Sequence, residues 1–485
     1  MNRKLLIIII LFNFLGFGIK AQESYFTKTY GDYYYNYGEK IIENHNGNVL
    51  VLGNSSVNNH TLNPAIFVLN DTGSVINNNY YYFENIYKAN DIIFSGSHYF
   101  ICGISNDNEN TDYDAFLMKL DTSYNILWTK HFGNENIWDE ATSIANLGNN
   151  IYMGVNSFGI DDFEVKASII SYNLDDETIT NMEFADFDSE ILSLQTFGDS
   201  VITGTGWILD EYTNTKTGFL CHFSPEEDNI NLKTYPSQID KSYISSICKT
   251  TDGWAMCGTS EKYFEETKKD GFIISLHNNF EYNFHKVIND DIYHLDEKYN
   301  KIECDWDGNL IVAGYTTSIN EGNEEMYFYK FEPGIWYMWA TTHGGMYYDE
   351  AIDLYLSSDS SYWFLGTSEF MGPNNHEIVV TKIDKNLNIA NDNWVHVVDI
   401  QSFDNKNTKL YYNNPVYDKC TISSNNINDI SSYRVFSTMG SLLKEYNFAP
   451  NSNFEIDFSD LKSGVYIIEI SNDKKFRTSL KVVKI

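Results

Sequence analysis

Two short acidic motifs carry the residues in this chain that could do chemistry. The triplet "DEA" occurs at 139–141 and again at 349–351, so Glu140 and Glu350 recur in the same local context. Two carboxyl groups in one site can serve as general acid and base when their surroundings separate their pKa values. A residue that recurs with a repeat, however, usually serves the repeat by capping a loop or binding backbone N–H groups. We therefore interpret both motifs as structural first and catalytic second.

Aromatic residues near these motifs suggest a binding face instead. Aromatic rings stack on sugar rings, and carboxylates accept hydrogen bonds from sugar hydroxyls. The same clustered oxygens would suit Ca²⁺, which is the one cofactor that the sequence leaves open. The alternative is an acidic surface that only keeps the protein in solution. The candidate ligand face comprises Trp138, Asp139, Glu140, Trp207, Tyr348, Asp349 and Glu350.

Catalytic motifs with a stricter signature are missing from the sequence. It contains no nucleophile elbow, zinc-binding helix motif or phosphate-binding loop. We assign no catalytic, cofactor-binding or metal-ligating residue; the sequence leaves catalysis open, and we favour a protein without it.

A repeat of about 52 residues must position these side chains. Its most regular mark is a glycine that ends an apolar run, as in "VLVLGNSS" and "WFLGTS", and successive copies lie 50 to 56 residues apart. So steady a period indicates a repeat architecture. The glycines are Gly53, Gly103, Gly154, Gly204, Gly258, Gly314 and Gly366.

Each copy predicts four strands. A turn of Asn, Asp, Gly or Ser precedes each glycine by five to seven residues and marks a hairpin, and further apolar segments lie on either side. A four-stranded sheet cannot bury both faces alone, whereas a closed ring of sheets can. We predict an all-β fold with a seven-bladed β-propeller over 24–400, and we expect the repeat glycine at the end of each second strand. The phrases "W-x-K-x-F-G", "D-E-A-x-x-I" and "G-T-S" resemble the loosely defined propeller repeats of exported bacterial proteins.

Two segments compete to complete the ring. "YFTKTYG" at 25–31 is a fourth-strand phrase with no first three strands before it, and "NWVHVVDI" at 393–400 is a fourth-strand phrase for the last unit. The sequence does not decide between them. In a propeller, the loops that join second to third strands and fourth to first strands emerge on one face. Acidic segments gather in those loops, at 134–140, 161–167, 261–270 and 320–326.

Cysteines add no disulfide framework. The chain has six Cys among 485 residues, too few for a disulfide-built fold of this size. Cys248 and Cys257 flank the turn at Asp252–Gly253 symmetrically, so a hairpin there would set them opposite each other. A cross-strand disulfide is one interpretation, and we favour two packed thiols.

The first residues predict export. Residues 1–21 join two cations to a short apolar run, which is typical of a secretory signal peptide cleaved between Ala21 and Gln22. No later segment reaches the length of a membrane span. The formal charge of −34 disfavours nucleic acid and anionic membranes as partners.

The last residues form a separate unit. The repeat stops near residue 400, 401–408 is a polar linker, and 409–485 holds ten Lys and Arg against eight Asp and Glu. Alternating strands and turns in this tail predict a small immunoglobulin-like β-sandwich. The tail resembles the type A C-terminal sorting domain of the Bacteroidetes type IX secretion system, although Asn413 stands where that family usually has Pro. The residues that carry the resemblance are Asn414, Pro415, Met439, Gly440, Gly464, Val465 and Tyr466, with the closing strand at 478–485.

The resemblance implies a route and a partner. The chain would reach the periplasm, and the secretion machinery would then recognise its tail and deliver it outside the cell or to the outer-membrane surface. Our leading hypothesis is an exported propeller that binds a glycan or protein ligand. The alternatives are a hydrolase or lyase acting on extracellular polysaccharide, and a purely structural adhesin.

Overall fold

The computed structural model describes most of the chain after the predicted signal peptide. The described residues are 25–31, 35–56, 61–106, 112–134, 137–159, 164–183, 188–198, 200–210, 213–224, 230–235, 240–262, 269–288, 296–317, 324–331, 338–344, 348–369, 376–386, 394–396, 410–412, 416–424, 431–437, 442–447, 453–462, 464–471 and 477–484. Within these ranges all regular structure is β-strand, as the sequence predicts.

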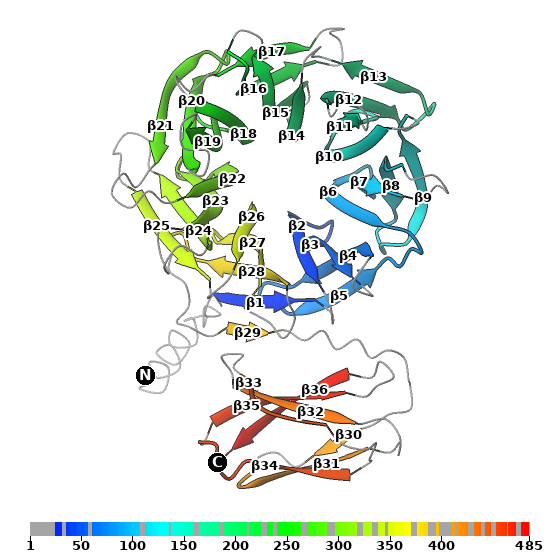
Figure 1. Ribbon diagram of the computed structural model, residues 1–485, viewed down its shortest axis with the longest axis vertical. Coiled ribbons are helices and arrows are strands. Elements are labelled where there is room, and N and C mark those ends of the chain that lie inside the picture. Colours follow the sequence, from blue (N-terminus) through cyan, green and yellow to red (C-terminus); the bar gives the residue numbers. More distant parts are fainter. Residues whose placement is uncertain are drawn as a thin grey trace, which may run out of the picture.

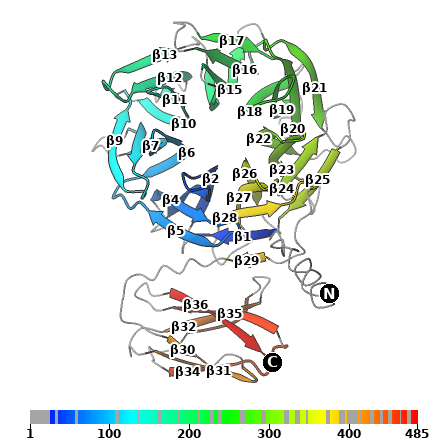
Figure 2. The same ribbon diagram turned by 180° about the vertical axis from the view of Figure 1, so that it is seen from behind.

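Four-stranded antiparallel sheets stand around a central axis, so the fold is a β-propeller (Figure 1; Figure 2 shows it from behind). Each sheet runs outward from an innermost strand in chain order. The first three sheets are β2 (Asn36–Glu43), β3 (Val49–Ser56), β4 (Leu62–Leu69), β5 (Val75–Tyr80); β6 (Tyr87–Ser95), β7 (His98–Ser105), β8 (Asp114–Leu120), β9 (Ile126–Phe132); and β10 (Ile137–Leu147), β11 (Asn150–Gly159), β12 (Val165–Asn173), β13 (Ile179–Glu183).

The next three sheets repeat the pattern. They are β14 (Ser189–Phe197), β15 (Val201–Asp210), β16 (Thr215–Phe223), β17 (Asn231–Thr234); β18 (Asp240–Lys249), β19 (Gly253–Lys262), β20 (Lys269–His277), β21 (Tyr282–Ile288); and β22 (Glu297–Cys304), β23 (Leu310–Thr316), β24 (Glu325–Phe331), β25 (Met338–His343).

Both chain ends contribute to the sheet that closes the ring. It contains β26 (Asp349–Leu356), β27 (Tyr362–Ser368), β28 (Glu377–Ile383), β1 (Phe26–Tyr30) and β29 (Trp394–His396), in that order. The N-terminal β1 pairs antiparallel with β28 and so takes the fourth place, and β29 pairs parallel with the outer side of β1. The two phrases that compete in the sequence are therefore both used, one as the fourth strand and one as an added fifth.

Apolar side chains pack between neighbouring sheets. In one cluster, Leu52 and Ile66 of the first sheet lie against Tyr87 and Phe116 of the next, and all four are almost fully buried. A second cluster joins the first sheet to the closing sheet, where Phe26 of β1 meets Trp363 edge to face at 5.3 Å. Neither face of a sheet stays open, which explains why the strands contain near-continuous apolar runs.

The repeat glycine lies inside the second strand and not at its end, contrary to the sequence-based expectation. β3 continues to Ser56 beyond Gly53, for example. The innermost strand has a one-residue bulge opposite the glycine, and a Cβ on Gly314 would lie 1.8 Å from the carbonyl oxygen of Lys298 there. Bulges bend a strand and redirect its side chains, and a glycine opposite the bulge leaves room for the displaced backbone. Two sheets differ: Gly206 takes this position in place of Gly204, and Val155 in place of Gly154.

The Cys pair is not arranged as the hairpin symmetry predicts. The bulge between Ile244 and Ser246 shifts the register, so Cys248 faces Ala255 and Cys257 faces Ser246. Both thiols are free and buried in one apolar cluster. The interpretation as packed thiols is confirmed.

The tail forms two sheets around its own core. β30 (Leu410–Tyr412), β31 (Lys419–Ser424) and β34 (Asn453–Asp457) make one sheet, and β33 (Leu442–Asn447), β32 (Ser432–Ser437), β35 (Gly464–Ser471) and β36 (Arg477–Lys484) make the other. Cys420 and Ile422 of the first sheet and Val435 and Ile468 of the second are fully buried in a common cluster.

Candidate binding channel

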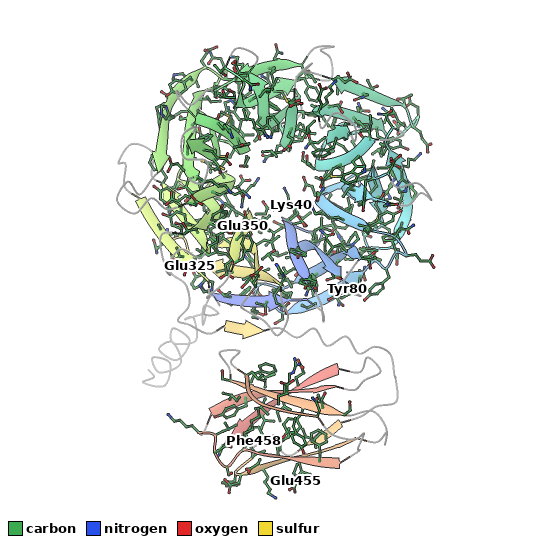
Figure 3. All side chains as sticks on the ribbon, viewed as in Figure 1. Lys40, Tyr80, Glu325, Glu350, Glu455 and Phe458 are labelled. Atoms are coloured by element: carbon green, nitrogen blue, oxygen red, sulfur yellow. The ribbon has the colours of Figure 1, made fainter. Side chains whose placement is uncertain are left out.

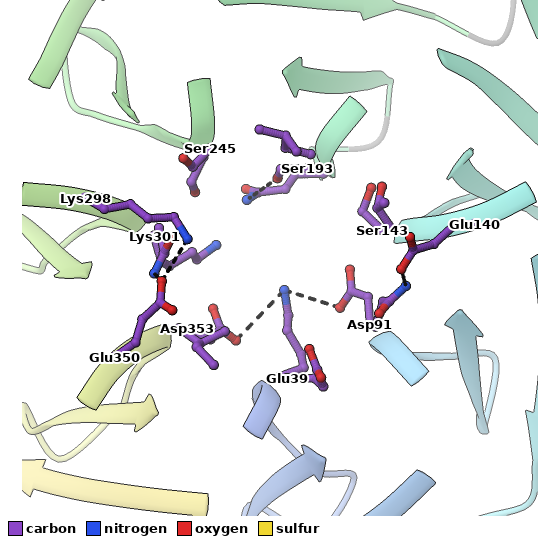
Figure 4. Close-up of a pocket in the computed structure, with 18 of the residues that line it drawn as sticks. Glu39, Asp91, Glu140, Ser143, Ser193, Ser245, Lys298, Lys301, Glu350 and Asp353 are labelled. Atoms are coloured by element: carbon purple, nitrogen blue, oxygen red, sulfur yellow. Dashed lines mark hydrogen bonds and ion pairs between the residues drawn. The ribbon is translucent and has the colours of Figure 1, made fainter. Parts of the chain in front are cut away.

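The bulges of the innermost strands turn one residue per sheet toward the axis of the ring. Pairing skips these residues, and each of them lines a central cavity of about 450 Å³ (Figure 4). This volume is in the range of small-molecule sites. The bulge residues are Glu39, Asn90, Thr142, Leu192, Ser245, Asn300 and Ile352.

Two equivalent Lys–Asn–Glu groups join neighbouring sheets at this channel. The amide of Asn300 donates to the Glu350 carboxylate at 2.7 Å and to the Ala351 carbonyl at 2.9 Å, and Lys298 pairs with Glu350 at 2.8 Å. Burial alone would raise the pKa of Glu350. The charge of Lys298 and hydrogen bonds from Lys298, Tyr348 and Asn300 outweigh burial and lower that pKa.

The second group repeats these contacts between another pair of sheets. Asn90 donates to the Glu140 carboxylate and to the Ala141 carbonyl, each at 2.9 Å. Lys88 reaches Glu140 at 3.5 Å. The recurring "DEA" triplet thus receives a lysine and an asparagine from the preceding sheet.

A lysine bridges two aspartates in the same cavity. Lys40 lies at the centre of the ring (Figure 3) and its Nζ is 3.3 Å from Asp91 and 4.0 Å from Asp353 (Figure 4). Each aspartate also accepts a backbone N–H of the following sheet, Asp353 from Ile41 at 2.9 Å and Asp91 from Ile144 at 3.1 Å. Burial alone would lower the pKa of Lys40, but the charges of Asp353 and Asp91 outweigh it and raise that pKa. These contacts tie four consecutive sheets of the ring together.

Glu39 differs from the other channel carboxylates. Its Oε1 accepts a hydrogen bond from the Asn54 amide at 2.9 Å, and no ion pair to it is found among the described residues. Burial, assisted by the charges of Glu140 and Glu350, raises the pKa of Glu39 to about 7. The charge of Lys88 and the bond from Asn54 oppose this shift without cancelling it. Glu39 thus changes charge near neutral pH.

The channel has two unlike walls. Strands β2, β6, β22 and β26 supply its lysines and most of its carboxylates. Strands β14 and β18 supply uncharged residues, and β10 adds Thr142 and Ser143 beside Glu140. In Figure 4, Ser193 and Ser245 lie across the cavity from Glu39 and Asp353. The uncharged residues of the hydroxyl wall are Thr142, Ser143, Leu192, Ser193, Gln195, Ser245 and Ser246.

The predicted ligand face divides into three environments. Glu140 and Glu350 line the channel, whereas Asp139 and Asp349 are buried at the starts of their strands. Asp139 accepts hydrogen bonds from the backbone N–H of Asn134 at 3.0 Å and from Ser157. Asp139 therefore fixes the loop before its strand, as the structural interpretation of the motif expects.

The three aromatic residues of that face also differ. Trp138 is 45% exposed and meets Tyr113 edge to face, and Tyr348 is 36% exposed and donates to Glu350. Trp207 is only 3% exposed. Its Nε1 donates to Glu190 and the Nζ of Lys216 lies 3.6 Å from its ring centre. The expectation of an exposed ring at Trp207 is therefore wrong, because neighbouring side chains cover it.

Several predicted features lie outside the described residues. They include Ala21 and Gln22, Asn414, Pro415 and Gly440 of the sorting motif, and parts of the acidic segments at 134–140, 161–167, 261–270 and 320–326. The described residues contain no group of three or more His, Cys, Asp or Glu placed to hold a metal ion. The Ca²⁺ hypothesis therefore gains no support from them.

Lys484 in the last strand of the tail binds backbone carbonyls of a neighbouring turn. Lys484 is buried, and its Nζ donates to the backbone carbonyls of Phe458 at 2.5 Å and Leu461 at 2.6 Å. Tyr466 of the sorting motif donates to the Lys462 carbonyl at 2.5 Å, and Gly464 pairs with Lys484 across β35 and β36. These contacts close the turn between β34 and β35.

Most of the channel residues were not predicted from the sequence. Lys88, Asn90, Lys298 and Asn300 carry a signal that could have revealed them, because "K-x-N" precedes both "DEA" triplets by one repeat. Glu39 has no counterpart in the other bulges, so repeat analysis alone does not mark it.

The class of protein follows from the fold and the tail: the chain is an exported β-propeller. Residues 410–485 match the family model described as a secretion system C-terminal sorting domain. The protein is accordingly a type IX secretion cargo with propeller repeats, and its tail directs it to the cell surface or the exterior. None of the curated protein sequences compared with the chain matches it. The described residues include no helix long and apolar enough to span a membrane.

Solved structures resemble the chain only remotely. The β-propeller domain of the Trilobed protease from Pyrococcus furiosus is 12% identical, with a TM-score of 0.41 over 76% of this chain and 97% of that one. The acylaminoacyl peptidase of Pyrococcus horikoshii is 13% identical, with a TM-score of 0.43 over 80% of this chain and 58% of that one. The Hadza microbial sialidase Hz136 is 6% identical, with a TM-score of 0.38 over 67% and 73%.

Proposed function

We propose that the protein is an exported binding module whose channel takes a hydroxyl-rich ligand, a glycan in the first instance. The channel supports this proposal because one cavity places serine and threonine hydroxyls across from carboxylates, lysines and amides. Sugar hydroxyls both donate and accept, so a mixed wall of this kind can satisfy them. Trp138 of β10 and Tyr348, which directly precedes β26, offer exposed rings close in sequence to Glu140 and Glu350.

We further propose the organisation that delivers this module. Residues 1–21 act as a signal peptide, 24–400 form a seven-bladed propeller, 401–408 link it to the tail, and 409–485 form an immunoglobulin-like sandwich. The route passes through the periplasm, and the partner of the tail is the type IX machinery of a Bacteroidetes cell. The closing sheet supports the boundary at 400, because β29 is its last strand.

A glycan array probed with the mature chain, with and without Ca²⁺, tests the binding proposal. We expect selective glycan binding that the variant Ser245→Trp abolishes, because Ser245 is a bulge residue in the cavity. The variant's circular dichroism should match the wild type. Absence of a bound glycan in both conditions would reject the sugar ligand and leave a protein ligand or the structural adhesin. A bound glycan that Ser245→Trp does not affect would place the site elsewhere.

One observation favours a second candidate, a polysaccharide hydrolase or lyase. Glu39 and Glu350 line one cavity, and their pKa values are shifted in opposite directions, to about 7 for Glu39 and downward for Glu350. Such a pair can supply a general acid and a charged base or nucleophile. However, Glu350 has the same lysine and asparagine partners as Glu140, which favours a structural role. Release of sugar products from array-positive polysaccharides, lost in both Glu39→Gln and Glu350→Gln, would establish catalysis.

A further inference from the structure

The charges in the channel do not balance. Each of its four lysines has a carboxylate partner within 3.5 Å: Lys40 with Asp91, Lys88 with Glu140, Lys298 with Glu350 and Lys301 with Glu303. Glu39 and Asp353 remain, and Asp353 also accepts the Ile41 N–H and lies 4.0 Å from Lys40. Among the described residues, Glu39 accepts one side-chain hydrogen bond, from the Asn54 amide. With Glu303 counted, six carboxylates share four lysines, and two are left over: Asp353 shares Lys40 with Asp91, whereas Glu39 forms no ion pair among the described residues.

The opposite wall has hydroxyls without partners. Ser143 is 3% exposed and Ser246 is 1% exposed, and both line the cavity. Among the described residues, neither Oγ has a hydrogen-bond partner. A buried hydroxyl without a partner costs free energy, and both oxygen atoms are covered, so each side chain must rotate before it can bond a ligand in the cavity. This observation is independent of the charge of Glu39.

We propose that the channel binds a sugar that bears a protonated amine, with the ammonium at Glu39 and the sugar hydroxyls along the hydroxyl wall. This inference rests on the proposed function and specifies its ligand. An ammonium donates charge-assisted hydrogen bonds to a carboxylate, and Glu39 forms no ion pair because its neighbour Lys88 contacts Glu140 instead. An acidic sugar would instead bring a second anion to Glu39, close to Glu140 and Glu350.

Three tetrasaccharides that share β-1,4-linked glucose backbones test the amine directly. Cellotetraose carries a hydroxyl at C2, the fully deacetylated chitosan tetramer carries an ammonium, and chitotetraose carries an N-acetyl group. Titration calorimetry with the mature chain at pH 7.0, where about half of Glu39 is ionised, should rank the chitosan tetramer at least about fivefold tighter than cellotetraose, because one charge-assisted bond contributes about 1.5 kcal/mol and about half of the sites must first lose a proton.

Glu39→Gln is the deciding variant, because it removes the charge and keeps the shape. We expect the preference for the amine to fall to about twofold or less while cellotetraose binding changes little. Glu183→Gln is the matched control, since Glu183 is exposed on the outermost strand β13. This control should retain the preference and so show that the overall negative charge does not produce it.

The outcomes distinguish failure of the amine inference from failure of the proposed glycan binding. If cellotetraose and the chitosan tetramer bind equally, or if Glu39→Gln keeps the preference, the amine inference fails and glycan binding stands. If none of the three sugars binds and the array is also blank, the proposed function itself fails. If Glu183→Gln loses the preference as fully as Glu39→Gln does, the attraction is non-specific and the inference is overturned.

Discussion

The amide of Asn300 connects two sheets by donating both to the Glu350 carboxylate at 2.7 Å and to the Ala351 carbonyl at 2.9 Å. Asn300 is a bulge residue, so it has no pairing partner on β23. Its amide instead reaches the next sheet. Asn90 makes the same two bonds to Glu140 and Ala141. The bulge residue therefore lines the channel and also joins two neighbouring sheets.

Asn300→Ala should therefore weaken the ring. The change leaves the Ala351 carbonyl without this donor and removes one bond to a buried carboxylate, so we expect a loss of about 2 kcal/mol in the free energy of unfolding. Urea unfolding followed by tryptophan fluorescence measures it. Asn77→Ala is the control, because Asn77 is exposed on β5, and it should change stability by less than about 0.5 kcal/mol. An equal loss in both variants would show that the hydrogen bonds of Asn300 to the next sheet do not stabilise the ring.

Gly314→Ala should destabilise the ring more strongly. The added Cβ would lie 1.8 Å from the Lys298 carbonyl oxygen, and backbone on both strands would have to move. We expect a loss of about 3 kcal/mol or more. Gly464→Ala in the tail provides a comparison, because a Cβ there would meet nothing nearer than 4.0 Å. Unfolding of both full-length variants in urea checks the difference, and a wild-type midpoint for Gly314→Ala would refute the account of the repeat glycine.

Hairpin turns and buried strands can be recognised from their residue types. Repeat spacing therefore predicted most of the fold. The bulges leave no such trace: one extra residue in an innermost strand hardly alters the apolar pattern around it. Glu39, Asn300 and Ile352 occupy equivalent bulges with unrelated side chains. The channel charges depend on neighbours from other repeats, and Trp207 is covered both by Lys216 of its own sheet and by Tyr243 of the next. Such contacts follow only from the assembled ring.

Lys484→Met should loosen the sorting domain without affecting the propeller. The ammonium of Lys484 donates to the Phe458 and Leu461 carbonyls inside the tail, and methionine replaces its stem without its charge. We expect a local loss of about 3 kcal/mol, seen as roughly 100-fold faster amide exchange in β35 and β36 of the full chain. Lys462→Met is the control, because Lys462 is exposed. Unchanged exchange in the Lys484 variant would show that these bonds contribute little.

The cysteines should behave as six buried or half-buried thiols. Burial raises the pKa of Cys248 and of Cys257, which suppresses the reactive thiolate. Iodoacetamide at pH 8 should leave both unlabelled in the native protein, whereas all six should react after unfolding without reductant. Cys304 is half-buried and should label first. Mass spectrometry of the labelled peptides checks the order, and an unfolded protein that needs reductant for full labelling would reveal a disulfide.

Glu39 should give the protein a stability that falls as pH rises. Its folded pKa of about 7 lies above the ordinary value of 4.5, because burial disfavours the charged form. Between these two values the folded state binds more protons than the unfolded state, so the free energy of unfolding decreases with increasing pH. Above pH 7 the full cost of a buried, unpaired carboxylate is present, of the order of 3 kcal/mol. Glu39→Gln removes this ionisation, so the variant should match the wild type near pH 4 and be more stable at pH 8. Urea unfolding of both proteins from pH 4 to 8 measures the difference. A difference that shrinks with increasing pH would mean that Glu39 is stabilised as an anion, and a bound cation would then be needed to explain it.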